Sequence, residues 1–172
     1  AHEAAAGEYV LVAGDVGPLG QLVKPYGPLT KAMVRELFRE QVRILLEENV
    51  DLLLFETFSS TLEATEAVKA ARELSREIPV LASMTFLADG KTTFGTEVVE
   101  ALSALEEAGA DVVGLNCTIG PQETLEVFQK VVSRVGVPVA AMPNAGYPWV
   151  VSGRTVYPAT PDYFREVARD FV

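Results

Sequence analysis

The sequence predicts an α/β fold in which five strands alternate with helices. Five short runs are apolar almost throughout, as expected for strands of a parallel sheet that is covered on both faces. The stretches between them carry apolar residues at intervals of three and four, the spacing of amphipathic helices. From the second run onward the strands recur at roughly 30 residues, the length of one strand–helix unit. The runs are YVLVAG from Tyr9, DLLLF from Asp51, PVLASMTF from Pro79, DVVGLN from Asp111 and PVAAM from Pro138.

The helices are marked by residues typical of their ends. The first helix, within residues 29–49, shows the apolar spacing most clearly and carries its charges on the other side. Gly109 and Gly136 follow two of the helices, as left-handed C-terminal residues do. The candidate N-caps are Thr30, Thr61, Thr96, Gly120 before Pro121, and Thr160 before Pro161.

Composition indicates one domain spanning residues 1–172. The chain is 49% hydrophobic and 22% charged, with a net charge of −10. Its basic residues are dispersed, which argues against a nucleic acid or an anionic membrane as partner and favours a small molecule. No apolar stretch approaches the roughly 20 residues that cross a bilayer, and the first nine residues lack the features of a secretion signal. Together with a single cysteine, which forms no internal disulfide, this predicts a cytoplasmic protein.

Two architectures fit five such units: a complete five-stranded doubly wound sheet, or part of an eight-stranded α/β barrel. The barrel is favoured because no glycine-rich phosphate loop follows the first strand, and because polar residues gather after nearly every strand. The opening AHEAAAG, which contains His2, has the pattern of the end of a helix, and the chain stops within the helical stretch FREVARDFV. We therefore expect a partial barrel.

Polar side chains at the strand ends are the candidates for chemistry, because barrel enzymes work at the carboxyl ends of their strands. Five strand ends supply them, and in a barrel they point at one mouth. They are Asp15, Glu56, Thr57, Ser83, Thr85, Asn116, Cys117 and Asn144.

Cys117 has a structural and a functional interpretation. Free cysteine is among the most buried residue types, so packing is one explanation. Its place beside Asn116, ahead of a helix start, also suits a thiolate. The only histidine, His2, is poorly placed to activate a nucleophile, so metal binding is the better functional hypothesis. Glu56 is either a solvated or ion-paired carboxylate at the end of its strand, or the partner of a substrate ammonium group.

Two turns and one loop are weaker signals. GDVGPLG at 14–20 and PNAG at 143–146 are typical of chain reversals, and the first lacks the spacing of a dinucleotide-binding motif. The loop GYPWVVSGRTVYP from Gly146 is either a lid over a ligand or a packed surface loop, and packing is the interpretation we favour.

Taken in order, several segments resemble the homocysteine-binding barrel of zinc-dependent homocysteine S-methyltransferases and methionine synthases. These segments are AGDVGPLG, DLLLFETFSSTLEATEAVKAARE, PVLASMTF with GKTTFGT, GADVVGLNCTIGP and VPVAAMPNAG. The resemblance spans nearly the whole chain and implies an eight-stranded barrel, of which these would be the third to the seventh strands.

The resemblance also implies roles for individual residues. Cys117 would be one of three thiolate ligands of a catalytic zinc, which binds the homocysteine sulfur for methyl transfer that yields methionine. Glu56 would anchor the amino group of homocysteine, with Asn116, Thr57 and Ser83 in the substrate pocket. Asn144 would be a possible additional contact to the metal.

The chain also departs from the family pattern. The adjacent cysteine pair and the glycine-rich first strand of the family are absent, so we expect other segments or domains of a parent protein to be needed and this chain to be inactive alone. The methyl donor stays open among methyltetrahydrofolate through cobalamin, S-methylmethionine and betaine. Two alternatives are a non-catalytic, flavodoxin-like binding or regulatory domain, and a metal-free barrel enzyme with Glu56 as general base.

Overall fold

The computed structural model describes residues 7–172 and contains one sheet of five parallel strands. The strands lie in chain order, β1-β2-β3-β4-β5, and each pairs in parallel with the next. This confirms the predicted α/β fold with five alternating units. The strands are β1 (Ala13–Val16), β2 (Leu52–Phe58), β3 (Val80–Met84), β4 (Val112–Asn116) and β5 (Val139–Met142).

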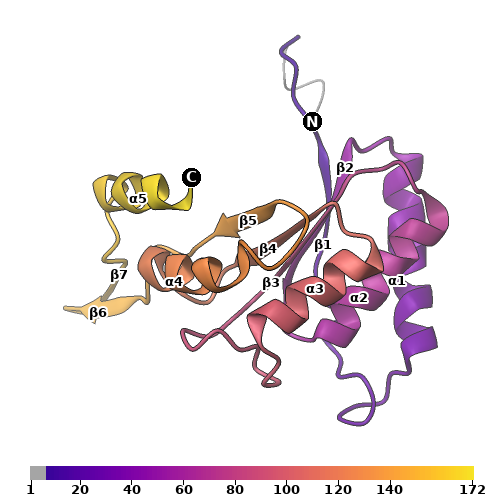
Figure 1. Cartoon of the computed structure of the whole chain (residues 1–172), viewed down its shortest axis with the longest axis horizontal. Helices are drawn as coiled ribbons and strands as arrows, with labels where there is room; N and C mark the ends of the chain where they lie inside the picture. Colours follow the sequence, from indigo (N-terminus) through magenta and orange to yellow (C-terminus); the bar gives the residue numbers. More distant parts are fainter. Residues whose placement is uncertain (1–6) are drawn as a thin grey trace.

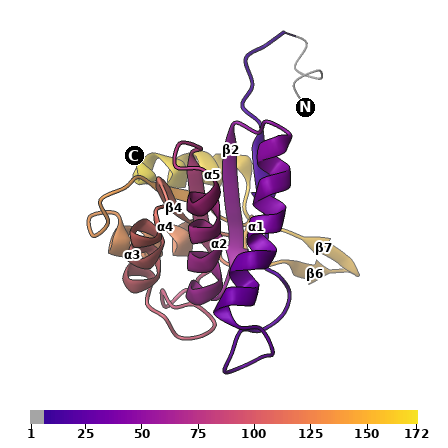
Figure 2. The same cartoon turned by 90° about the vertical axis from the view of Figure 1, so that its right-hand side faces the viewer.

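The helices pack in sequence along one face of the sheet. Helix α1 packs on α2, α2 on α3, and α3 on α4, and the first three stand side by side in Figure 2. A doubly wound sheet instead reverses its strand order once and carries helices on both faces. The partial barrel is thereby confirmed, and the doubly wound alternative, with its flavodoxin-like fold, is wrong. The helices are α1 (Lys31–Glu47), α2 (Thr61–Leu74), α3 (Val98–Ala108), α4 (Pro121–Val131) and α5 (Pro161–Ala168), followed by the 3-10 helix η2 (Arg169–Phe171).

The hydrophobic core fills the layer between the helices and the sheet. Phe38 of α1 packs against Phe55 and Phe58 of β2, with ring centroids 6.5 and 5.8 Å apart. All three rings are fully buried, and burial of such a side chain stabilises the fold by about 1.5–3 kcal/mol. No helix within residues 7–172 is long and apolar enough to cross a membrane.

The opposite face of the sheet is less covered. Leu54, Leu81 and Val112 are in register and are partly exposed. Side chains alternate between faces along a strand, so Glu56 and Ser83, two residues further along, lie on this same face toward the carboxyl ends. The sheet thus presents its polar strand-end residues on the side away from the helices.

The first strand begins later than predicted. The apolar run from Tyr9 suggested a strand from that residue, but Tyr9 is 90% exposed and pairing with β2 starts at Ala13. The reason is that β2 itself begins at Leu52, so the described chain offers no partner strand to the residues before Val12.

Helix ends were predicted correctly at three N-caps and wrongly at two. Thr30, Gly120 and Thr160 precede their helices as expected. Ser60, not Thr61, caps α2, because its hydroxyl accepts from the N–H of Glu63 at 3.3 Å. Helix α3 begins after Glu97 without a side-chain cap, because Thr96 belongs to a turn in which its N–H donates to the Thr92 hydroxyl.

Two later predictions also need correction. Gly109 ends α3 at φ 109° as expected, but α4 ends at Val131, well before Gly136. The loop from Gly146 forms a hairpin of β6 (Trp149–Val151) and β7 (Arg154–Val156) that projects from the sheet (Figure 1). We expected this loop to pack on the surface of the protein. Trp149 is 60% exposed, and both short strands of the hairpin extend beyond the five-stranded sheet, so that expectation is wrong for the described residues.

Arg72 joins three elements at the amino end of the sheet. Its guanidinium donates to the carbonyls of Gly109 and Ile78, both at 2.7 Å, and to Asp111 at 2.5 Å. The Arg72 side chain is 18% exposed, so water replaces these bonds poorly.

Replacing Arg72 with Met should therefore destabilise the chain by about 2–4 kcal/mol, because two carbonyls lose their donor. Urea unfolding monitored by circular dichroism measures this. The control is Arg43→Met, which breaks an exposed ion pair with Glu47 and should change stability by no more than about 0.5 kcal/mol. Equal effects of the two substitutions would contradict the structural role given to Arg72.

Candidate functional site

The carboxyl ends of β2 and β4 are joined by a cluster of Thr57, Asn116 and Cys117. The Asn116 side chain accepts from the backbone N–H of Thr57 at 3.1 Å and donates to its hydroxyl at 2.8 Å. The same amide donates to the Cys117 sulfur at 3.5 Å, and the Thr57 hydroxyl lies 3.7 Å from that sulfur. Since β3 lies between β2 and β4, Asn116 spans the end of β3 to hold this cluster together.

The backbone of the cluster is held in an uncommon conformation. Thr57, Cys117 and Thr118 have φ values of 66, 58 and 65°. These values lie in the left-handed region, which residues other than glycine rarely adopt. Thr57 lies at a bulge, where the register between β2 and β3 shifts. Such strained residues cost about 1–3 kcal/mol each and concentrate at functional sites.

The loop after β4 is fixed against the loop after β5. The N–H of Cys117 donates to the carbonyl of Met142 at 3.0 Å, and the N–H of Asn144 donates to that of Ile119 at 3.0 Å. Asn144 is exposed, and Cys117 is intermediate in exposure. The structure thus brings the loops of Asn144 and Cys117 together, with the thiol at the edge of the site.

Glu56 lies in an acidic environment beside this cluster. Partial burial raises the pKa of Glu56 above its usual value, and the negative charge of nearby Asp15 raises it further. Both residues lie at carboxyl ends of neighbouring strands. Two adjacent carboxylates of this kind form a favourable binding site for a cationic group such as an ammonium.

Ser83 and Thr85 are bonded to the backbone of β2. The Ser83 hydroxyl donates to the carbonyl of Phe55 at 3.4 Å, and the Thr85 hydroxyl donates to that of Phe58 at 3.3 Å. Ser83 lies on the same face of the sheet as Glu56 but is only 1% exposed. These two hydroxyls join the carboxyl ends of β2 and β3 by hydrogen bonds. They are not bonded to the cluster of Thr57, Asn116 and Cys117 in the described part of the chain.

The thiol of Cys117 is chemically suited to bind a metal, but the described residues do not complete a metal site. Within residues 7–172 there is no group of three His, Cys, Asp or Glu side chains that could hold a metal ion. His2, considered above, lies outside the described residues. Cys117 is thus a candidate metal ligand whose partners are not supplied by residues 7–172.

The five parallel strands follow one another in chain order, and helices cover one face of the sheet. Polar side chains lie at the carboxyl ends of the strands. This arrangement is that of part of an α/β barrel domain. The family model for homocysteine S-methyltransferase matches residues 1–172. The chain belongs to that family, as its sequence predicted.

Relatives of known name support this membership. The chain is 33% identical over 165 residues to methionine synthase of Mycobacterium tuberculosis, covering 94% of this chain and 14% of that protein. It is 34% identical over 110 residues to the S-methylmethionine–homocysteine S-methyltransferase of Pongo abelii, covering 62% of this chain and 30% of that protein. It thus spans a minor part of both relatives.

A solved structure shares the fold. The apo form of the homocysteine methyltransferase MmuM from Escherichia coli superimposes with a TM-score of 0.69 at 23% identity. The match covers 84% of this chain and 53% of that one. The chain therefore corresponds to about half of the solved barrel protein.

One feature beside the site was not predicted from the sequence. A pocket lies between the loops after β1, β2 and β3, and Tyr26, Glu63 and Phe94 line it. Ser60 followed three residues later by Glu63 has the pattern of a capping box, which marks the start of a helix and does not indicate a pocket. In the structure the Glu63 carboxylate instead accepts from the N–H of Leu19 at 2.7 Å.

The strain at Thr57 can be measured by comparing two substitutions. Thr57→Ala and Thr57→Gly both remove the hydroxyl, but glycine adopts a positive φ without a steric penalty. We expect the glycine variant to be more stable than the alanine variant by about 1 kcal/mol.

The control for this comparison is Thr155 in β7, where φ is not positive and alanine should be at least as stable as glycine. Chemical denaturation of the four variants gives the four free energies. If alanine were the better residue at position 57 as well, the left-handed conformation there would not be strained.

The charge of Asp15 contributes to the raised pKa of Glu56 and can be removed by substitution. Asp15→Asn should lower the pKa of Glu56, because it removes the neighbouring negative charge, while burial still holds that pKa above its usual value. Carboxyl carbon shifts in an NMR titration report the change. The control is Asp162→Asn on α5, which also removes one negative charge but at a position far along the chain. If both substitutions changed the pKa of Glu56 equally, the effect of Asp15 would not be local.

Proposed function

We propose that the protein containing this chain transfers a methyl group to the thiol of homocysteine, and that this chain supplies the surface that binds homocysteine. The observation that carries the proposal is the cluster of Thr57, Asn116 and Cys117 beside Glu56, at the carboxyl ends of two strands. Membership of the homocysteine S-methyltransferase family supports it.

The charges of the site suit the amino end of homocysteine. Glu56 and Asp15 attract its ammonium group, and both lie on strands that hold them in place. Ionised Glu56 is required for this attraction, so binding weakens as the pH falls through its raised pKa. The carboxylate pair thereby orients the substrate relative to Cys117.

Cys117 is proposed as one ligand of a zinc ion, with the remaining ligands coming from residues other than 7–172. When bound, zinc holds the substrate sulfur as a thiolate, the form that attacks a methyl group. Asn116 and Thr57 act on Cys117 by hydrogen bonds that fix the direction of its sulfur. Asn144 is brought close by its loop and is proposed as an additional contact.

Two of the relatives are named for homocysteine as acceptor and differ in the named donor. The relatives' names specify homocysteine with either S-methylmethionine or betaine, or methionine synthesis as such. The proposal therefore concerns homocysteine, the methyl acceptor, and not the methyl donor. The described residues are proposed to bind this acceptor.

Substitution of Cys117 in the full-length protein tests the proposal. Cys117→Ala should abolish stoichiometric zinc binding, measured by elemental analysis, and should lower homocysteine-dependent methyl transfer by more than about 100-fold, because a ligand is lost. Thr118→Val, at the next residue, should retain both properties.

Glu56→Gln separates substrate anchoring from metal binding. This variant should keep its zinc and raise the KM for homocysteine by about tenfold or more, because the ammonium loses an ionic partner. If the Cys117→Ala variant bound as much zinc as the unmodified protein, Cys117 would not be a metal ligand and would be a packing residue.

A further inference from the structure

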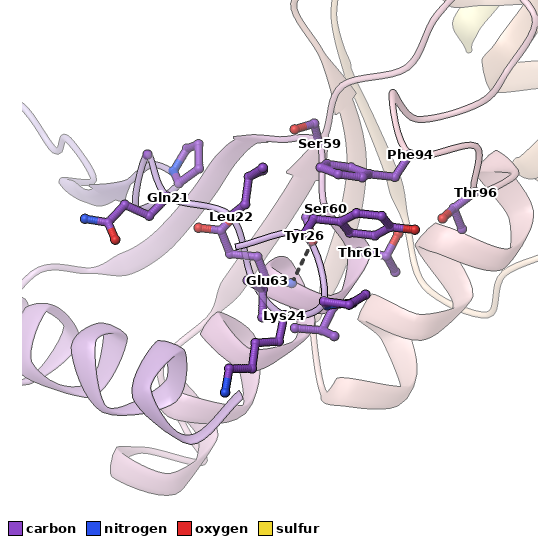
Figure 3. Close-up of a pocket in the computed structure, with 15 residues that line it drawn as sticks. Gln21, Leu22, Lys24, Tyr26, Ser59, Ser60, Thr61, Glu63, Phe94 and Thr96 are labelled. Atoms are coloured by element: carbon purple, nitrogen blue, oxygen red, sulfur yellow. Dashed lines mark hydrogen bonds between the residues drawn. The ribbon is translucent and has the colours of Figure 1, made fainter. Parts of the chain in front are cut away.

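The pocket beside the candidate site is formed by three loops at the carboxyl ends of β1, β2 and β3. It has a volume of about 440 Å³, within the range of small-molecule sites. None of Glu56, Thr57, Asn116 and Cys117 lines it. Figure 3 shows its walls, with Gln21 and Leu22 on one side and the rings of Tyr26 and Phe94 on the other.

Glu63 places a buried carboxylate at this pocket. The residue is 6% exposed, and among residues 7–172 the one hydrogen bond to its carboxylate comes from the N–H of Leu19. No ion pair to Glu63 exists in the described part of the chain. A buried carboxylate without a cationic partner is costly, and a ligand cation relieves that cost.

Lys24 also lines the pocket but does not neutralise Glu63. Figure 3 shows its ammonium directed away from the ring pair, and no ion pair joins the two residues. The negative charge of Glu63 is therefore available to a ligand.

Two aromatic rings complete the environment of a cation. Tyr26 and Phe94 come from different loops and meet with centroids 5.9 Å apart. Tyr26 is 72% and Phe94 44% exposed, so both rings are accessible to a ligand at the pocket. Ring faces attract cations as well as apolar groups.

The hydroxyl groups of the pocket favour a cation that carries N–H donors. The Thr61 hydroxyl oxygen, at the start of α2, is buried and has no hydrogen-bond partner among residues 7–172. Ser59 and Thr96 add two further hydroxyls to the lining. A primary ammonium has three N–H donors, which match a carboxylate and neighbouring hydroxyl acceptors.

We propose that this pocket is a second binding site, which takes a small primary amine in its protonated form. The ammonium group pairs with Glu63, and the body of the amine packs against Tyr26 and Phe94. This site is separate from the Cys117 cluster and does not depend on the proposed methyl transfer.

Benzylamine, which is protonated at neutral pH, is the probe for this site, and benzyl alcohol is its neutral counterpart of similar shape. Saturation-transfer NMR and calorimetric titration with the full chain should show saturable binding of benzylamine. Benzyl alcohol should bind about tenfold or more weakly, because it lacks the charge that Glu63 attracts.

Three variants locate the binding. Glu63→Gln keeps an acceptor for the Leu19 N–H but removes the charge, and should weaken benzylamine binding by about tenfold or more. Phe94→Leu, at a half-exposed ring, tests the same pocket if the first variant fails to fold, and should weaken binding about threefold or more. Glu77→Gln, beyond the other end of α2, and Cys117→Ala should leave binding unchanged.

The proposal is overturned by any of three results. These are no saturable binding of benzylamine to the unmodified chain, equal binding of the alcohol and the amine, or unchanged binding in both the Glu63 and the Phe94 variants. Loss of binding in Cys117→Ala would move the amine to the homocysteine site and overturn it as well.

Discussion

The bulge in β2 at Thr57 is the feature on which the candidate site depends. It shifts the register between β2 and β3, so the N–H of Thr57 bonds to the side chain of Asn116 and not to a strand partner. Asn116, two strands away, gives this N–H its hydrogen-bond acceptor. With its oxygen fixed in this way, the Asn116 amide group donates to the Thr57 hydroxyl and to the Cys117 sulfur. One irregularity in a strand thereby sets the geometry of the whole cluster.

The two ends of the sheet are stabilised differently. At the amino end, Arg72 pairs its charge with Asp111 and bonds two carbonyls, so the connections there are fully satisfied. At the carboxyl end, Glu56 and Glu63 carry carboxylates that burial disfavours, and no described cation pairs with Glu63. Unpaired charge and left-handed backbone both reduce stability, and both are concentrated where ligands of a barrel enzyme bind. The stabilising bonds of Arg72 thus lie at the amino end of the sheet, and the residues of the candidate site lie at its carboxyl end.

The uncovered face of the sheet fits the place of this chain within its family. Leu54, Leu81 and Val112 are in register on the face opposite the helices and are only partly buried. In a closed barrel this face is the interior and is filled by side chains from strands across the barrel. The match to about half of a solved homologue agrees with this orientation, because the helices of this chain lie on the outer side.

The sequence by itself determined the order of the elements and the family, and it supplied the candidate residues of the site. Buried strands and amphipathic helices leave periodic patterns, and the segments around Glu56 and Cys117 are distinctive enough to indicate homocysteine chemistry. The tertiary structure decided what depends on contacts between distant residues. Examples are the start of β1 at Ala13, which the start of β2 fixes, and the exposed hairpin from Trp149. The bond between Thr57 and Asn116, 59 residues apart, and the uncompensated charge of Glu63 are of the same kind, since no local pattern encodes a partner that lies across the sheet.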